Sequence, residues 1–275
     1  MRHFFRSDSA ELLFVEAGAG LPVVFLHPTP LDHSFWQPLV QRLTGVRAIT
    51  PDLRGHGGSA LGSGLPVGIF NRVPDAPVLT MKQLAADTWA LMDHLAISEA
   101  VFVGCSIGGY VLFELWRLAP QRIRGLAFIC SKPQPDTPAN QDRRVATIAQ
   151  ARAQGSAQIF DGMAQTLIGA SARAVRPAIA EELRSSMQQT PEALVATQAG
   201  LATRPDSVPT VATIHVPIFA LCGGEDPAVT SPEMETLQAA PGGCDWHLLA
   251  GAGHFAAYEQ PDNVAQRLGS WLQRF

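Results

Sequence analysis

The five residues from Gly104 to Gly108 constrain the fold most, because they place Ser106 between two glycines where an apolar strand meets an apolar helix. The run 100–103 before them has no polar face, which is typical of a strand buried on both sides of a parallel sheet. A strand that turns directly into a helix forces its corner residue into a strained conformation and brings the flanking chain very close. Glycines at the second neighbours remove the Cβ atoms that would clash. The pattern therefore predicts a strand–turn–helix corner with the Ser106 hydroxyl exposed.

The pentapeptide is also the G-x-S-x-G pattern in which a serine serves as a nucleophile. Three fixed residues in a long, glycine-rich chain occur by chance in roughly one sequence in ten, so a tight turn without chemistry fits the pentapeptide equally well. A serine hydroxyl is a poor nucleophile near neutral pH, and it needs a base within hydrogen-bond reach and a third group that orients the base. The rest of the chain must therefore supply a histidine and an acid.

Composition excludes several other classes of protein. The 275 residues carry a formal net charge of −4, which provides no basic surface for nucleic acid. The N-terminus becomes charged before an apolar segment of signal length develops, and no apolar run reaches the roughly 18 residues of a membrane span. We therefore expect a cytoplasmic protein that does not bind membranes. Apolar surroundings without CxxC spacing favour buried free thiols for Cys105, Cys130, Cys222 and Cys244.

Strand and helix patterns alternate along most of the chain. Apolar runs predict strands at 12–15, 22–26, 46–49, 100–103, 123–130, 217–222 and 246–249, of which the first two form a strand pair. Helical spacing predicts helices at 35–43, 84–95, 110–118 and 264–272. Thr80 and Gln83 resemble a capping box before the second of these helices. Dense glycine and proline predict a long loop at 61–78.

The alternation stops between residues 139 and 203, where no strand-like run appears and several short helices are predicted. The breaks fall at Gly155, 169–171, Pro177 and Pro191. The resulting fold class is α/β, with a mostly parallel central sheet flanked by helices. We expect one core domain made of residues 1–132 and 211–275, into which residues 133–210 are inserted as a helical cap.

The histidine and the acid that Ser106 requires both follow this insertion. Asp226 and His254 each lie on a loop that directly follows an apolar strand run. Loops at the carboxyl ends of parallel strands are where α/β sheets assemble their sites. Glu225 competes with Asp226 for the role of the acid, and the glycine and proline around Asp226 favour the aspartate. The chain order serine, aspartate, histidine is the one expected for this architecture.

With these residues, the chain resembles the α/β-hydrolase family over nearly its whole length. In that family a segment after an early strand supplies part of the oxyanion hole, and here that segment is 27–30. The resemblance implies that the backbone N–H groups of Thr29 and Ile107 are the two oxyanion donors. Pro28 stands where glycine is usual, which affects the path of the loop, although Pro28 is not the implied donor. The turn 52–59 is similar to a family turn that is structural in most members, and we assign it no catalytic role.

The resemblance implies an esterase-like serine hydrolase that needs no cofactor and no metal. We expect Ser106 to attack the carbonyl of a small, largely apolar carboxylic ester, His254 to transfer the proton and Asp226 to orient the imidazole. Lactone hydrolysis and carbon–carbon bond hydrolysis use the same triad and remain alternatives, as does a slow ligand receptor on the same fold. Haloalkane dehalogenases and epoxide hydrolases are disfavoured because they place an aspartate at the nucleophile position.

Three further residues are predicted to contact the substrate, an ester or lactone small molecule. Met163 and Leu167 lie in the predicted insertion, where a helical core is the alternative explanation for apolar side chains. His33 lies in the loop that follows the oxyanion segment, where helix capping by Asp32 or Ser34 is the alternative use of such a cluster. His56 is interpreted as an ordinary histidine without metal-ligand spacing. The sequence leaves a homodimer open.

Overall fold

The computed structural model describes residues 2–275, which form a single eight-stranded sheet in the order β1-β2-β4-β3-β5-β6-β7-β8. Strands β3 to β8 run parallel to one another, whereas β1 and β2 pair antiparallel with their neighbours. This is the mostly parallel sheet that the sequence predicts. The strands are β1 (Arg2–Ser7), β2 (Ala10–Gly18), β3 (Leu21–Leu26), β4 (Val46–Pro51), β5 (Ala100–Cys105), β6 (Ile123–Ile129), β7 (Ile218–Gly223) and β8 (Cys244–Leu249).

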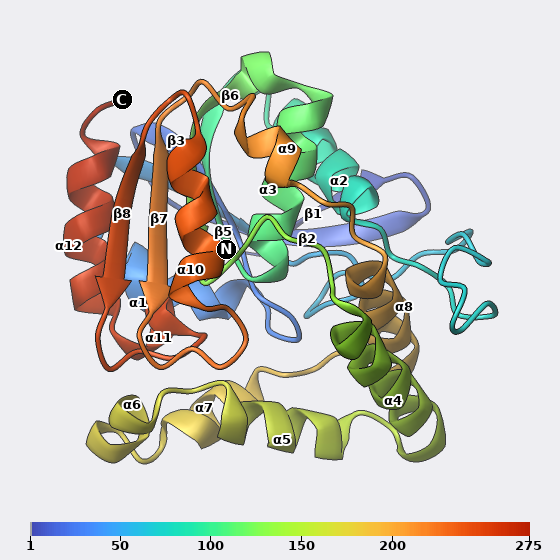
Figure 1. Ribbon diagram of the computed structural model, residues 1–275. Helices are drawn as coiled ribbons and strands as arrows, with labels where there is room; N and C mark the ends of the chain where they lie inside the picture. Colours follow the sequence, from blue (N-terminus) through green and yellow to red (C-terminus); the bar gives the residue numbers. More distant parts are fainter. Residues whose placement is uncertain (1) are drawn as a thin grey trace.

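Helices cover both faces of the sheet (Figure 1). They are α1 (Gln37–Val40), α2 (Met81–His94), α3 (Ile107–Leu118), α4 (Pro138–Gln154), α5 (Ala157–Thr166), α6 (Ala170–Val175), α7 (Ile179–Ser185), α8 (Pro191–Ala202), α9 (Val208–Val211), α10 (Ser231–Glu235), α11 (Ala256–Glu259) and α12 (Pro261–Leu272). Within residues 2–275, no helix has both the length and the apolar character that crossing a bilayer requires.

Side chains of the central strands alternate between two hydrophobic cores, one on each face of the sheet. On β5, Val101 and Val103 belong to the core that includes α12, whereas Phe102 belongs to the core that includes α2 and α3. Because both faces of β5 are buried, its sequence has no polar side. The corner after β5 is therefore held between two packed layers.

The predicted pairing of the first two apolar runs is wrong. Strands β2 and β3 are joined by a short turn, but β4 lies between them in the sheet and hydrogen-bonds to both. Gly18 and Gly20 have positive φ angles of 75° and 121°, and a Cβ atom on either would collide with the backbone at Gly45 or Val46. The two glycines thus let the turn pass closely around the start of β4. The N-terminal strand β1 was not predicted.

Five helices, α4 to α8, occupy the stretch between β6 and β7 in which the sequence predicts no strand. Thr137 and Thr190 cap α4 and α8 by accepting hydrogen bonds from backbone N–H groups, and a proline follows each at the first helical position. Helices α5, α6 and α7 lie beyond the carboxyl ends of β7 and β8 (Figure 1). The apolar side chains Ile148 of α4, Phe160 of α5 and Leu194 of α8 share one core with Phe255 in the loop after β8.

The capping box predicted before α2 is half present. The Thr80 hydroxyl accepts a hydrogen bond from the Gln83 N–H at 3.1 Å, but the Gln83 amide donates to Asp87 at 3.2 Å. Asp87 also forms a buried, bidentate pair with Arg54. The predicted buried free thiols are confirmed for Cys105, Cys130 and Cys222, whereas Cys244 is partly exposed.

Candidate active site

The corner between β5 and α3 has the predicted strained geometry. Ser106 adopts φ 52° and ψ −117°, a conformation that side-chain-bearing residues rarely occupy, and Ile107 begins α3 directly after it. A Cβ atom on Gly104 would collide with the backbone of Gly108, and one on Gly108 would collide with the carbonyl of Leu26. The two glycines are therefore required by close packing of the elbow against α3 and β3. The prediction of an exposed Ser106 is wrong: the residue is only 9 % exposed, although it lines a cavity.

Asp226 and His254 meet at the carboxyl ends of β7 and β8. The Nδ1 atom of His254 lies 2.9 Å from Oδ2 and 3.0 Å from Oδ1 of Asp226, and the two side chains are 5 % and 0 % exposed. The Asp226 carboxylate also accepts hydrogen bonds from the N–H groups of Ala228 and Val229. A carboxylate at Nδ1 fixes the proton on that nitrogen, and Nε2 is then free to accept a proton.

The competing acid has a different partner. Glu225 accepts hydrogen bonds from the backbone N–H and the hydroxyl of Ser171 in α6. These bonds lower the pKa of the Glu225 carboxyl, which stays ionised and holds α6 against the loop after β7. Glu225 therefore connects the inserted helices to the sheet, whereas Asp226 faces the imidazole.

Ser106 and His254 line the same cavity, which has a volume of about 380 Å³. Thr29, Met163 and Leu167, three further residues singled out from the sequence, line it as well. The carbonyl of Leu167 accepts a hydrogen bond of 2.8 Å from the His254 N–H, so the end of α5 is fixed directly to the histidine loop. Five of the predicted site residues thus come together around one partly enclosed cavity.

A partly buried carboxylate stabilises the loop that carries His254. Glu259 accepts hydrogen bonds from the N–H groups of Gly253 and Phe255 on either side of the histidine, and from Gly169 at the start of α6. Burial raises the pKa of Glu259 in spite of these three bonds. The carboxylate thereby joins the histidine loop to the inserted helices through backbone contacts.

The segment 27–30, which the sequence predicts to supply part of an oxyanion hole, is held by a buried histidine. His27 Nε2 accepts a hydrogen bond from the Leu53 N–H at 2.9 Å, and its Nδ1 lies 3.0 Å from the Pro28 carbonyl. Burial lowers the pKa of His27, so the ring is neutral and donates from Nδ1. The Pro28 carbonyl also accepts from the Leu31 N–H. Pro28 therefore fixes the path of the loop through its carbonyl group, although it lacks an N–H.

His33 lies against Asp52 and is not among the described residues that line the cavity. Its Nδ1 is 2.7 Å from Asp52 Oδ1, and its backbone N–H donates to the same oxygen. Burial alone would lower the pKa of His33, but the hydrogen bond and charge of Asp52 outweigh burial and raise it. Asp32 caps the short 3₁₀ helix that follows by accepting from the Ser34 N–H. The capping alternative is thus confirmed for Asp32.

The cavity lining is more polar than the sequence predicts. Beside Met163 and Leu167, charged side chains reach it from α4, from α10, from the residue just before the insertion and from the two ends of the insertion: Lys132, Asp136, Arg143, Arg144, Arg204 and Glu233. The cavity therefore offers charged groups to a ligand in addition to the apolar side chains that the sequence predicts. Sequence analysis missed these residues, although the adjacent basic pair Arg143–Arg144 near the start of the insertion was a visible signal.

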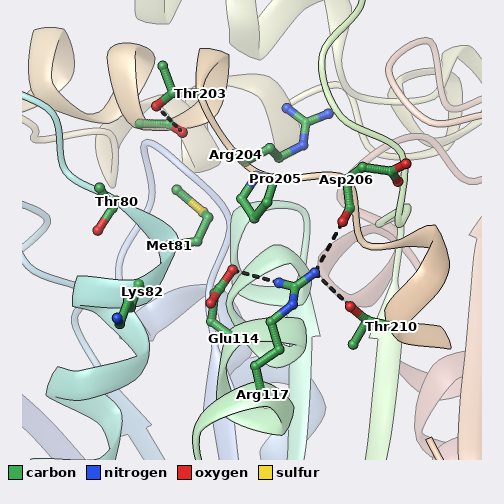
Figure 2. A pocket seen from close by; sticks show the side chains of 11 residues that line it. Thr80, Met81, Lys82, Glu114, Arg117, Thr203, Arg204, Pro205, Asp206 and Thr210 are labelled. Atoms are coloured by element: carbon green, nitrogen blue, oxygen red, sulfur yellow. Dashed lines mark hydrogen bonds and ion pairs between the residues drawn. The ribbon is translucent and has the colours of Figure 1, made fainter. Parts of the chain in front are cut away.

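A second hollow of about 470 Å³ lies between α2, α3 and the segment after α8 (Figure 2). Arg117 donates to Glu114, to Thr210 and to the carbonyl of Asp206, at distances of 2.6 to 3.2 Å. Its guanidinium is thus already bound by protein acceptors. Arg204 lines both hollows, and Figure 2 shows its guanidinium turned away from Glu114 and Arg117.

A serine at a strand-to-helix elbow and a histidine–aspartate pair at the carboxyl ends of one parallel sheet are the features of a hydrolase-type α/β enzyme. The sequence profile of the alpha/beta hydrolase family matches residues 23–267, and the chain belongs to that family. This finding agrees with the fold and with the resemblance drawn from the motifs.

Individual relatives match along nearly the whole chain. The sequence is 27 % identical to 3-oxoadipate enol-lactonase 1 from Acinetobacter baylyi over 91 % of this chain and 88 % of that protein. Among solved structures, a thermophilic esterase from Thermogutta terrifontis with malate bound is 30 % identical, with a TM-score of 0.89 and coverage of 100 % and 98 % of the two chains. An enol-lactonase from Burkholderia xenovorans shares the fold, with 24 % identity, a TM-score of 0.86 and coverage of 98 % and 100 %.

Proposed function

We propose that the protein is a serine hydrolase that cleaves a small carboxylic ester through an acyl-enzyme intermediate. The observation that carries this proposal is the convergence of two groups on one cavity: Ser106 at the strained elbow, and His254 with its Nδ1 bound to Asp226. A purely structural role would not explain why a buried histidine bound to a carboxylate lines the same cavity as a strained serine.

In the proposed mechanism, His254 Nε2 accepts the proton of the Ser106 hydroxyl as the oxygen attacks the ester carbonyl. The imidazolium that forms is stabilised by Asp226, which is held in place by two backbone N–H groups. The imidazolium then protonates the leaving alcohol, and an acyl group remains on Ser106. Water, activated by the same imidazole, releases the acid and restores the enzyme.

The negative charge on the carbonyl oxygen needs donors that are already in place. We propose the N–H groups of Thr29 and Ile107 for this role. Ile107 is the first residue of α3, where N–H groups have no partner within the helix and the helix dipole favours negative charge. Thr29 lies on the loop that neutral His27 fixes. Each such donor contributes about 10² to 10³ in rate in enzymes of this kind.

We further propose that residues 133–210 act as a cap that restricts substrate size and excludes water. Met163 and Leu167 line the cavity from α5 and its end, and three hydrogen-bonded contacts fix the inserted helices to the active-site loops. A cavity of about 380 Å³ admits a small acyl group. Met163 and Leu167 are the proposed apolar contacts to the acyl chain, and His33 is left out of the proposed substrate site.

A lactone is the second candidate substrate, because two relatives are named as enol-lactonases. A lactone is a cyclic ester, so the same attack, oxyanion and deacylation steps apply, and the leaving alcohol stays joined to the acyl group. The two candidates are separated by comparing an open-chain ester with a lactone of the same carbon number.

Turnover of p-nitrophenyl acetate and p-nitrophenyl butyrate tests the proposal. We expect the protein to hydrolyse at least one of them well above background, and Ser106→Ala to abolish this activity. Ser34→Ala is the matched control, since Ser34 is a helix-capping partner of Asp32 outside the cavity lining. If wild-type protein and Ser106→Ala give equal, near-background rates, the hydrolase proposal fails and a ligand receptor on this fold remains.

A further inference from the structure

The cavity that contains Ser106 and His254 has an excess of positive charge. Four of its lining side chains are cationic, from one lysine and three arginines, and two are acidic. Such an arrangement on the wall of a small, partly enclosed space attracts anions, because the charges are poorly screened by solvent there. The pairing of these groups decides how much of the charge is available to a ligand.

One aspartate is shared by two of the arginines. Asp136 lies 3.0 Å from the Arg144 side chain and 2.5 Å from that of Arg204, and its own side chain is only 2 % exposed. A single carboxylate balances one of the two guanidinium groups, so this cluster keeps one net positive charge. Arg204 also packs on the ring of Tyr110, with the guanidinium carbon 4.3 Å from the ring centre.

Arg204 has unused hydrogen-bonding capacity. Its Nη1 and Nη2 atoms donate to Asp136 and to the carbonyls of Leu201 and Gln134. Its Nε atom is buried and has no partner among the described residues. A buried N–H without an acceptor raises the free energy of the folded protein. An anionic ligand that reached this atom would accept its hydrogen bond and remove that penalty.

The other two cationic side chains of the cavity, Lys132 and Arg143, differ in whether they are paired with an acid. Lys132 is paired with Glu233, which also accepts from the Thr230 N–H at the start of α10, so this pair is neutral overall. Arg143 is exposed on α4, lines the cavity, and forms no ion pair with any residue in the described range 2–275. Arg143 is therefore the cation most available to a charged ligand.

We propose that this cavity selects esters or lactones that carry a carboxylate away from the scissile bond, and that Arg143 binds this carboxylate with support from the Arg144–Asp136–Arg204 cluster. Guanidinium groups bind carboxylates through paired, charge-assisted hydrogen bonds. The inference rests on the proposed hydrolase function, and it names the substrate class of the same site. Half-esters of short dicarboxylic acids are the simplest substrates of this class.

Two esters of equal shape test the proposal: monoethyl glutarate and ethyl 5-methylhexanoate, in which a neutral branched end replaces the carboxylate. The readout is the ratio of their kcat/KM values, obtained from ethanol release. We expect wild-type protein to favour the charged ester by about tenfold or more, because a charge-assisted contact is typically stronger than a neutral one. Raising the salt concentration from about 0.05 to 0.5 M should reduce the preference through screening.

Arg143→Gln should reduce this preference several-fold, chiefly through a higher KM for monoethyl glutarate, and Arg143→Glu should reverse it. Arg152→Gln is the matched control on the same helix, since Arg152 is an exposed residue paired with Asp75 outside this cavity lining. We expect Arg152→Gln to keep the wild-type preference. Equal preferences in wild type, Arg143→Gln and Arg143→Glu would overturn the inference, as would a wild type that favours the neutral ester.

Glutarate binding to Ser106→Ala, measured by calorimetry, separates failure of this inference from failure of the proposed function. If neither ester is hydrolysed but glutarate binds and Arg143→Gln weakens that binding, the anion subsite stands and the hydrolase proposal fails. If both esters are hydrolysed equally in a Ser106-dependent manner and glutarate does not bind, the hydrolase proposal stands and the anion subsite fails.

Discussion

The Nε2 atom of His56 lies 3.1 Å from the hydroxyl oxygen of Thr29, the residue proposed to supply one oxyanion donor. The same nitrogen lies 3.2 Å from the side-chain amide nitrogen of Gln189, in the segment between α7 and α8. Burial lowers the pKa of His56 to about 3, so its ring is neutral. With Nδ1 donating to the Arg54 carbonyl, Nε2 is an acceptor that joins the oxyanion loop to the inserted helices.

Replacing His56 should therefore affect catalysis without removing a reacting group. We expect His56→Ala to lower kcat about tenfold, with a smaller effect on KM, because a displaced Thr29 donor stabilises the oxyanion less well. Steady-state kinetics on p-nitrophenyl butyrate measure the effect. His94→Ala, at an exposed histidine, is the control. An unchanged kcat in His56→Ala would show that Thr29 is positioned without this contact.

The buried histidines also predict how stability depends on pH. Histidines in the unfolded chain bind protons near pH 6.5, whereas native His56 stays neutral down to about pH 3, and burial also lowers the pKa of His27. The unfolded state thus binds more protons below pH 6.5, and the free energy of unfolding should fall on acidification. The slope is at most about 1.4 kcal/mol per pH unit for each histidine.

Urea denaturation between pH 7 and pH 5 measures this dependence. His56→Gln should show a shallower loss of stability than wild type, because one of the depressed histidine pKa values is removed. Identical slopes for the two proteins would mean that the His56 ring is protonated in the native state.

Replacing Asp226, the carboxylate bound to His254, should lower kcat far more than replacing its neighbour Glu225. Asp226→Asn keeps the size of the side chain but disfavours the required tautomer of His254, so we expect kcat to fall by about 10⁴. Glu225→Gln removes charge from a contact with Ser171 and should lower kcat less than about tenfold. If the two variants lose activity in the opposite order, the assignment of the acid is wrong.

A buried ion pair under the N-terminal strands predicts a large effect on stability. Arg54 donates twice to Asp87 at 2.6 and 2.8 Å, and the Ser7 hydroxyl donates to the same carboxylate. Asp87→Ala leaves the Arg54 guanidinium buried without its partner, which should lower the free energy of unfolding by about 3–5 kcal/mol.

The comparison for Asp87→Ala is Asp262→Ala, which breaks the exposed pair with Arg42. That variant should lower the free energy of unfolding far less than Asp87→Ala does, because solvent screens the exposed pair. Chemical denaturation of both variants at neutral pH gives the two values. Similar losses in the two proteins would contradict the importance of burial at Asp87.

The sequence predicted the sheet, the elbow and the positions of Asp226 and His254, because these depend on local patterns. The strand β5 can be identified because both of its faces are apolar. The elbow can be identified because close packing requires glycine at positions 104 and 108. The position of β4 between β2 and β3 was missed because the sequence shows which strands are consecutive, whereas pairing depends on the whole sheet.

The polar half of the cavity could not be predicted for a related reason. Arg143 lies in α4 and Arg204 follows α8, and only the packing of these two helices brings both side chains to the same wall. The sequence identifies His56 as ordinary because it shows no metal-ligand spacing, and its partners Thr29 and Gln189 are both far from it along the chain. Contacts between distant segments carry no periodic signal along the chain.

Mass spectrometry of the acid-quenched reaction with p-nitrophenyl butyrate tests the central claim most directly. The account predicts a butyryl group on the peptide that contains Ser106 in wild-type protein, and no such group in His254→Ala under the same reaction time. A butyryl group on another residue, or equal labelling of Ser106 in the two proteins, would contradict it.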